Sequence, residues 1–248
     1  MGEPLSGLSV SQLIRFDLGR IQYERNFTSE EGLGPVFNQT SCASCHNAPV
    51  GGAGSQQVTR FGQLDKKGGF DPLAHLGGSL LNANAIHEDC AEEIPAMANV
   101  TSLRVTPGAL GYGLIEAIPD ADLLDVSASQ PESQRGTVRW TEAIEAPGVP
   151  RVGRFGWKSQ LPTILSFSAD AAQQELGLTT RLLPDENPPQ GDPQLLLDCD
   201  EVPDPEDIAD ADGFEYLDRV TDFQRFLAAP PQTPPAGMTG EAVFVATG

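Results

Sequence analysis

The first segment whose apolar residues follow a helical pattern is residues 9–25. Ser9 followed by Gln12 matches a capping box, in which each side chain bonds a free backbone N–H at the start of a helix. The apolar stripe on this segment is partial and consists of Leu13, Ile14, Phe16 and Ile21. We therefore expect an amphipathic helix here.

Two later segments show the same kind of pattern. Residues 162–178 begin with Pro162, a residue suited to a first helical turn, and place an apolar group roughly on one face: Ile164, Phe167, Ala171 and Leu178. Residues 214–227 carry the last apolar stripe: Phe214, Leu217, Val220, Phe223, Phe226 and Leu227. Both segments predict helices.

The intervening segments are less regular. Residues 32–46 pass from a Gly-rich start into the sequence CASCH, and residues 56–112 mix short strand-like pieces with turns. Residues 113–126 predict two short helical turns that Pro119 separates. The Pro- and Asp-rich residues 184–212 predict a long surface loop.

Together these segments predict a mainly α fold with long loops and a few short strands. The run PPQTPP at 230–235 is typical of a stiff linker and is the best domain boundary in the chain. We therefore expect a first domain at 1–229, followed at 230–248 by the linker and the start of a second, truncated domain.

The amino-acid composition restricts the kinds of molecule that we expect the protein to bind. Fifteen basic residues against 35 acidic ones give a formal charge of −20, which repels phosphate backbones and anionic lipids. No apolar run approaches the roughly 20 residues that cross a bilayer. We expect neither nucleic-acid binding nor membrane insertion.

The motif that carries chemistry is Cys42-Ala43-Ser44-Cys45-His46. Covalent attachment of a c-type haem needs two thiols that each reach a vinyl group, followed at once by an imidazole that reaches the iron. Cys42 and Cys45 are therefore predicted to attach haem c, and His46 to ligate its iron.

Three other interpretations of the motif compete with this one. A thioredoxin-like redox pair would need a strand before it and a long helix after it, but a Gly-rich loop follows. A structural zinc site needs clustered ligand pairs, whereas the remaining Cys and His residues are scattered. The third interpretation is a plain disulfide or two buried thiols.

A haem iron has either a second axial ligand, typical of electron carriers, or an open face, typical of peroxide or ligand chemistry. The sequence does not rank the candidates for the second ligand: His75, His87, Met97 and Met238. An inert six-coordinate iron would make the protein a monohaem electron carrier without catalysis.

The other two cysteines, Cys90 and Cys199, either form a disulfide or remain two independent buried thiols. The acidic run DPEDIADADG fails the calcium-binding EF-hand pattern, because Ile208 and Arg219 occupy its first and last ligand positions. We interpret this run as a solvated loop.

The end of the chain repeats part of the first motif. Phe37 precedes Cys42 by five positions, and Phe244 places the matching position at residue 249, one beyond Gly248. We expect the chain to be a fragment that ends just before a second Cys-x-x-Cys-His; a chance Val-Phe pair in a tail is the alternative.

The chain resembles the di-haem oxidoreductases, also labelled thiol oxidoreductase-like, which are related to bacterial di-haem cytochrome c peroxidases. The blocks EEGLGPVFNQTSCASCHNAP and RFGWKSQLPTILSFSADAAQQELGLT carry the resemblance most specifically, and GYGLIEAIPDADL, DCDEVPDPED and FQRFLAAPPQTPPAGMTGEAVF add to it. It implies that the mainly α domain at 1–229 is a cytochrome c-like haem domain with long loops and a few short strands, and that a second c-type haem domain, truncated here, begins within 230–248. It also implies a periplasmic or otherwise extracytoplasmic location, a redox partner protein and peroxidase-type activity.

The resemblance carries the haem roles over to Cys42, Cys45 and His46. Within it, Trp157 is a candidate electron relay between haems, and Arg154 or Lys158 is a candidate partner of the haem propionates. Core packing for Trp157 and solvent exposure for the two cations are the alternatives.

Overall fold

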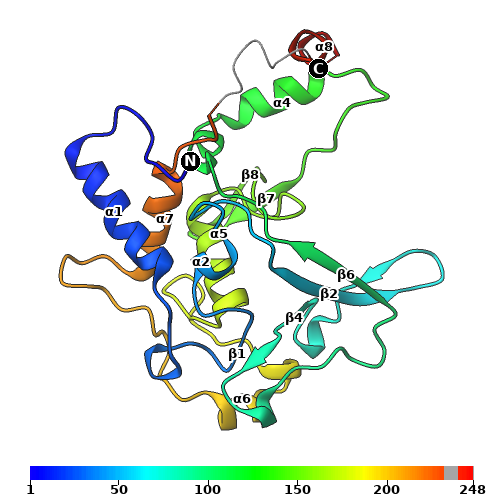
Figure 1. Cartoon of the computed structure of the whole chain (residues 1–248). Coiled ribbons are helices and arrows are strands. Elements are labelled where there is room, and N and C mark those ends of the chain that lie inside the picture. The colour runs from blue at the N-terminus through cyan, green and yellow to red at the C-terminus, as the bar shows by residue number, and fades with distance from the viewer. Residues whose placement is uncertain (232–239, 248) are drawn as a thin grey trace.

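The computed structural model describes residues 1–231 and 240–247. Two long helices form its centre: α1 (Val10–Glu24) packs along α7 (Tyr216–Phe226), although they lie at opposite ends of the sequence (Figure 1). Ser9 caps α1 through the predicted capping box with Gln12. Both helices were predicted from the sequence.

The buried face of α1 differs from the predicted stripe. Phe16 and Tyr23 are buried, whereas Ile14 and Ile21 are 54% and 59% exposed. Between the two buried aromatics lies Gly19, where a Cβ would stand 2.3 Å from a backbone oxygen of α7. The helices approach most closely where α1 has no side chain, so a search for apolar residues alone selects the wrong face.

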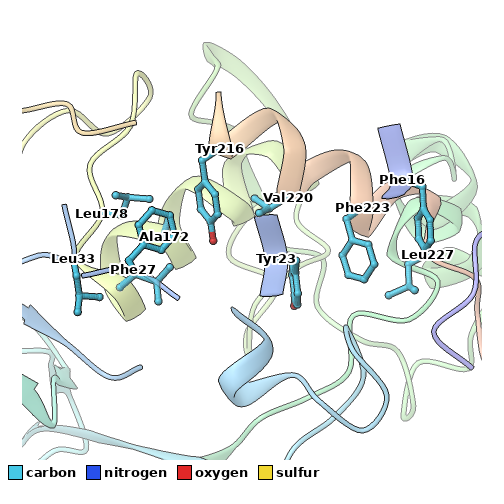
Figure 2. Packing of buried hydrophobic residues seen from close by; sticks show 11 residues of the cluster. Phe16, Tyr23, Phe27, Leu33, Ala172, Leu178, Tyr216, Val220, Phe223 and Leu227 are labelled. Carbon is cyan, nitrogen blue, oxygen red and sulfur yellow. The ribbon is translucent and has the colours of Figure 1, made fainter. Parts of the chain in front are cut away.

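The main core lies around this helix pair. It joins α1 and α7 to the segments before β1 and after α5, and Figure 2 shows its aromatic side chains in a row along α7. Its members are Phe16, Tyr23, Phe27, Leu33, Ala172, Leu176, Leu178, Tyr216, Val220, Phe223 and Leu227.

The strands form three small antiparallel sheets. In the largest, β2 (Gln57–Leu64) pairs with β6 (Val100–Val105), β4 (Leu80–Leu81) and β3 (Phe70–Asp71). The other two join β1 (Val36–Phe37) to β5 (Asn84–Ala85), and β7 (Trp140–Ala143) to β8 (Ala146–Val152).

The remaining helices are short. Pro119 caps α4 (Asp120–Ser129) after α3 (Tyr112–Glu116), as the sequence predicted, and α2 is the single turn Cys42–Cys45. The predicted helix at 162–178 is α5 (Ile164–Ala171), continued by a π-helical turn, Ala172–Leu176. The helices that remain are α6 (Pro193–Cys199), inside the predicted loop, and α8 (Glu241–Thr247). Short 3₁₀ turns occupy Ser29–Glu31, Ala74–Leu76, Glu88–Cys90 and Pro189–Gly191.

The predicted mainly α fold class is wrong. Among the described residues, 35% are helical and 18% are in strands or bridges, and a cytochrome c-like haem-domain fold is not shown. Strand-like pieces were expected within 56–112, but not that two of them, β2 and β6, pair into a sheet. The two strands are separated by more than 30 residues, and local patterns do not reveal such distant pairing.

In the part of the chain that the structure describes, no helix is long and apolar enough to cross a bilayer.

Candidate haem site

The motif turn α2 is built by its own polar residues. Ser41 precedes the helix and its side chain accepts a hydrogen bond from the Ser44 N–H at 3.1 Å. The turn closes when the His46 N–H donates to the Cys42 carbonyl at 2.9 Å. Cys42, Cys45 and His46 all line one cavity of about 340 Å³, a volume within the range of small-molecule sites.

The two motif cysteines are free thiols. Burial raises the pKa of Cys42 and of Cys45 to about 11, and a nearby Glu175 adds to the effect. Cys42 Sγ lies 3.1 Å from the hydroxyl of Tyr216, which comes from α7. A thiol with so high a pKa is a poor nucleophile at neutral pH, so the arrangement disfavours a thioredoxin-like role.

His46 is held in one orientation by the loop that follows it. Its Nδ1 lies 3.2 Å from the Gly52 carbonyl oxygen, which requires the Nδ1–H tautomer and leaves the lone pair on Nε2. Burial lowers the pKa of His46, so the neutral ring is favoured. A neutral imidazole anchored through Nδ1 to a backbone carbonyl is the usual state of a metal-ligating histidine.

Three arginines line the cavity walls. Arg60 and Arg104 come from the paired strands β2 and β6, and Arg104 lies over the Trp157 ring with 5.6 Å to its centroid. Arg154 is buried in the wall and pairs with Asp120, but its Nε–H has no acceptor.

Two acidic residues share the cavity with these arginines. Glu175 lies in the π-helical turn and accepts a hydrogen bond from the Asn38 side chain at 2.9 Å. Burial raises the pKa of Glu175 and that of the neighbouring Asp170, so both hold a proton more readily than exposed carboxyls do. π-helical turns are rare in proteins, and those that do occur are often found at functional sites. The position of Glu175 in such a turn fits this tendency.

Sequence reasoning found only part of this site. Trp157 and Arg154 line the cavity, whereas Lys158 is exposed and does not. Arg60, Arg104 and Glu175 were missed. Positions 58, 60 and 104 lie near one another once β2 and β6 are paired in register, but the sequence does not show that register.

The predicted second ligands lie elsewhere. His75 and Met97 are exposed and do not line the cavity. His87 pairs with Glu201 at 2.8 Å, also away from the cavity. Met238 lies outside the described residues. Among the described residues that line the cavity, His46 is the one histidine, and no methionine accompanies it.

The remaining cysteines form the Cys90–Cys199 disulfide, which was one of the two alternatives left by the sequence. The disulfide joins the 3₁₀ turn Glu88–Cys90, which follows β5, to α6, which lies within the Pro- and Asp-rich residues 184–212.

Comparison with protein families gives one match. Residues 81–192 match the family described as "Di-haem oxidoreductase, putative peroxidase". The family predicted from the sequence is confirmed over this segment. The segment carries Arg104, Arg154 and Glu175 of the cavity wall, whereas Cys42–His46 lie outside it. Comparisons with curated proteins and with solved structures gave no match.

The family match supports an oxidoreductase role, and its description implies a haem cofactor. The cavity residues fit such a group on two observations of this structure. The two thiols are free, and the neutral imidazole anchored through Nδ1 keeps a lone pair on Nε2.

Proposed function

We propose that this protein is a c-type haem oxidoreductase with peroxidase-type activity. Cys42 and Cys45 would hold the haem covalently, each thiol adding its S–H across one vinyl group, and His46 would ligate the iron through Nε2. The observation that carries the proposal is the placement of two free thiols and an oriented neutral imidazole on one cavity wall.

The bound haem would supply the redox couple for electron transfer and for peroxide reduction. The cavity walls would supply charge and protons. Of the two predicted partners of a haem carboxylate, Arg154 lines the cavity and would place a positive charge beside it, whereas the exposed Lys158 does not line the cavity. Reduction of H₂O₂ to two waters consumes two protons and two electrons, and the electrons would come from a redox partner protein. Glu175 and Asp170 line the cavity and have pKa values raised by burial, so they are the carboxyls placed to supply the protons.

Peroxidase-type activity is favoured over a monohaem electron carrier by the composition of the cavity lining. Apart from His46, no histidine or methionine of the described residues lines it, so these residues provide no typical second axial ligand. Trp157 lies on the wall and is half exposed, which suits a relay to an external electron donor, although not specifically to a second haem.

We propose a periplasmic or otherwise extracytoplasmic location, which the Cys90–Cys199 disulfide supports because reducing compartments disfavour such bonds. The electron donor would be a redox partner protein. The family description names two haems, and residues 1–248 contain one Cys-x-x-Cys-His; a second motif beyond residue 248 stays a prediction.

The experiment uses the full chain, exported by a host with a c-type haem maturation system. We expect a ferric spectrum typical of an open or weakly held axial position, which changes on addition of cyanide and reacts with peroxide. A six-coordinate spectrum unaffected by cyanide and peroxide would instead show the electron carrier.

A matched pair of variants tests the role of Glu175 in supplying protons. Glu175→Gln removes the titrating carboxyl and should lower peroxide turnover and flatten its pH profile, with haem content unchanged. Glu132→Gln, at an exposed position, is the control and should behave as the wild type. A Glu175→Gln protein with the wild-type pH profile would exclude this role.

A further inference from the structure

A group of carboxylates lies near the two ends of residues 184–212, the Pro- and Asp-rich segment called the acidic loop below. The cluster is next to the segment that follows the π-helical turn. One carboxylate oxygen from each of Glu186, Asp204 and Glu206 lies within 4.8 Å of the other two. Asp200 is near enough to act electrostatically on Glu186. Acidic groups gather on many protein surfaces, so the cluster needs further support before it indicates a ligand.

That support comes from Glu186, the buried member of the cluster. It is 7% exposed. Its Oε2 accepts a hydrogen bond from the Asn187 N–H at 3.1 Å, but its Oε1 is buried and has no hydrogen-bond partner. A buried carboxylate oxygen without a donor is costly, because the interior replaces none of its lost hydration. An electropositive group at this point would remove the cost.

Asp204 and Glu206, the other two members of the cluster, also have too few hydrogen-bond donors. The Thr179 hydroxyl lies 2.7 Å from Asp204 Oδ1 and also contacts Glu206 Oε2. A hydroxyl has one hydrogen, so it can donate to only one of the two carboxylates at a time. The Thr179 N–H, at 2.7 Å from Glu206 Oε2, supplies one further donor.

No protein cation balances this charge. Within residues 1–231 and 240–247, none of the lysine, arginine or histidine side chains forms an ion pair with Glu186, Asp200, Asp204 or Glu206. Carboxylates gathered this closely without a protein cation repel one another, and a bound cation would relieve that repulsion.

We propose that Glu186, Asp204 and Glu206 bind one Ca²⁺ ion. All the donor atoms in the cluster are oxygens, with no histidine or cysteine among them, and this selects a hard cation. Ca²⁺ accepts six to eight oxygens in irregular geometry, so backbone carbonyls and water can complete the shell, whereas Mg²⁺ needs a near-ideal octahedron.

The failed EF-hand pattern does not argue against this site. Its ligands come from the two ends of a loop and not from twelve consecutive residues. Ca²⁺ would hold together the two ends of the segment 186–206. The disulfide from Cys199 to Cys90 anchors the middle of the same segment. The inference goes beyond the proposed function and does not depend on haem.

The test is calorimetric titration of CaCl₂ into the full disulfide-intact chain, first treated with EGTA, at pH 7. We expect saturable binding of one Ca²⁺ per chain, weakened by about tenfold or more in Glu186→Gln and in Asp204→Asn. Glu132→Gln makes the same chemical change at an exposed position and should bind as the wild type does. Absence of saturable binding at millimolar Ca²⁺, or equal binding by wild type and Glu186→Gln, would overturn the proposal.

Thermal unfolding shows whether a variant has lost its fold and not only its ion. Ca²⁺ should raise the unfolding temperature of the wild type and of Glu132→Gln but not that of Glu186→Gln. In EGTA, Glu186→Gln should unfold cooperatively and no earlier than the wild type, because the amide has nearly the shape of the carboxyl group and carries no charge beside Asp204 and Glu206. A Ca²⁺-induced rise in Glu186→Gln equal to that of the wild type would contradict the assignment.

Discussion

At the scale of single residues, Arg154 connects the cavity wall to the helices beside it. Its side chain is 2% exposed. Its guanidinium donates to the carbonyls of Ile115 at 2.9 Å and Glu116 at 3.0 Å, to that of Ile118, and to the carboxylate of Asp120. Each of these acceptors lies at the junction of α3 and α4, so Arg154 closes that junction while it lines the cavity.

Replacement of Arg154 should therefore destabilise the protein strongly. Arg154→Ala removes its hydrogen bonds to this junction and leaves a cavity where its buried side chain lay, although Asp120 keeps Arg151. We expect a loss of about 2–4 kcal/mol in the free energy of unfolding. Arg151→Ala is the matched control, since Arg151 binds the same Asp120 from a more exposed position, and should cost about 1 kcal/mol or less. Urea unfolding measures both, and equal losses would refute the structural role of Arg154.

The sequence could predict those site residues that lie close together in the chain and form a motif of known chemistry. Cys42, Cys45 and His46 form one motif and share the cavity wall. Glu175 could not be predicted, because its place depends on a π-turn that has no clear sequence pattern.

At the scale of elements, the contact between α1 and α7 depends on a residue without a side chain. A Cβ at Gly19 would lie 2.3 Å from the Arg219 carbonyl oxygen and 3.0 Å from Phe223. The two helices were predictable from their caps and apolar residues, but the face of α1 that meets α7 was not, because glycine adds nothing to an apolar pattern.

Gly19→Ala should therefore lower stability, although alanine is the better helix former. We expect the overlap with α7 to cost about 1–3 kcal/mol, more than the roughly 1 kcal/mol that helix propensity returns. Asp17→Ala, at an exposed position of the same helix, should be close to neutral. If urea unfolding shows Gly19→Ala to be more stable than the wild type, the close packing is wrong.

The start of α7 should give the stability a measurable pH dependence. The carboxylate of Asp207 accepts the N–H groups of Tyr216 at 2.7 Å and Leu217 at 2.9 Å, yet burial raises its pKa from 3.8 to about 6. Between these two pH values the folded chain holds the proton more tightly than the unfolded chain. The contribution of Asp207 to the free energy of unfolding therefore falls as pH rises from about 4 to 6, and is level above that.

The decrease amounts to up to about 3 kcal/mol. Urea unfolding of the wild type and of Asp207→Asn between pH 4 and 7 isolates it, because other titrating groups are common to both proteins. The wild type should lose stability relative to the variant across this window. Parallel curves for the two proteins would contradict the raised pKa of Asp207.

At the scale of the whole molecule, distant pairings determine the fold. Strand β2 pairs with β6 across more than 30 residues, and Cys90 is joined to Cys199 across 109 residues. Local apolar patterns predicted the helices of this chain but not these pairings, which explains why the sequence suggested a mainly α domain. The sequence left the disulfide as one of two alternatives because thiol spacing does not fix a pairing.

Loss of the disulfide should destabilise the entire chain. A closed loop of this length restricts the unfolded state, and we expect the Cys90→Ser, Cys199→Ser double variant to lose about 2–4 kcal/mol in urea unfolding. A reducing agent should destabilise the wild type but leave the double variant unchanged. Equal sensitivity of both proteins to the reducing agent would show that the bond adds no stability.

The central claim, covalent haem on Cys42 and Cys45, is tested most directly by a denaturing pyridine haemochrome spectrum of protein exported with c-type haem maturation. We expect haem to stay with the denatured wild-type chain and with the Cys90→Ser, Cys199→Ser variant. Cys42→Ala should shift the spectrum toward a single remaining thioether, and Cys42→Ala with Cys45→Ala should lose the haem on denaturation. A colourless wild-type chain, or haem retained by the Cys42, Cys45 double variant, would contradict covalent attachment at these cysteines.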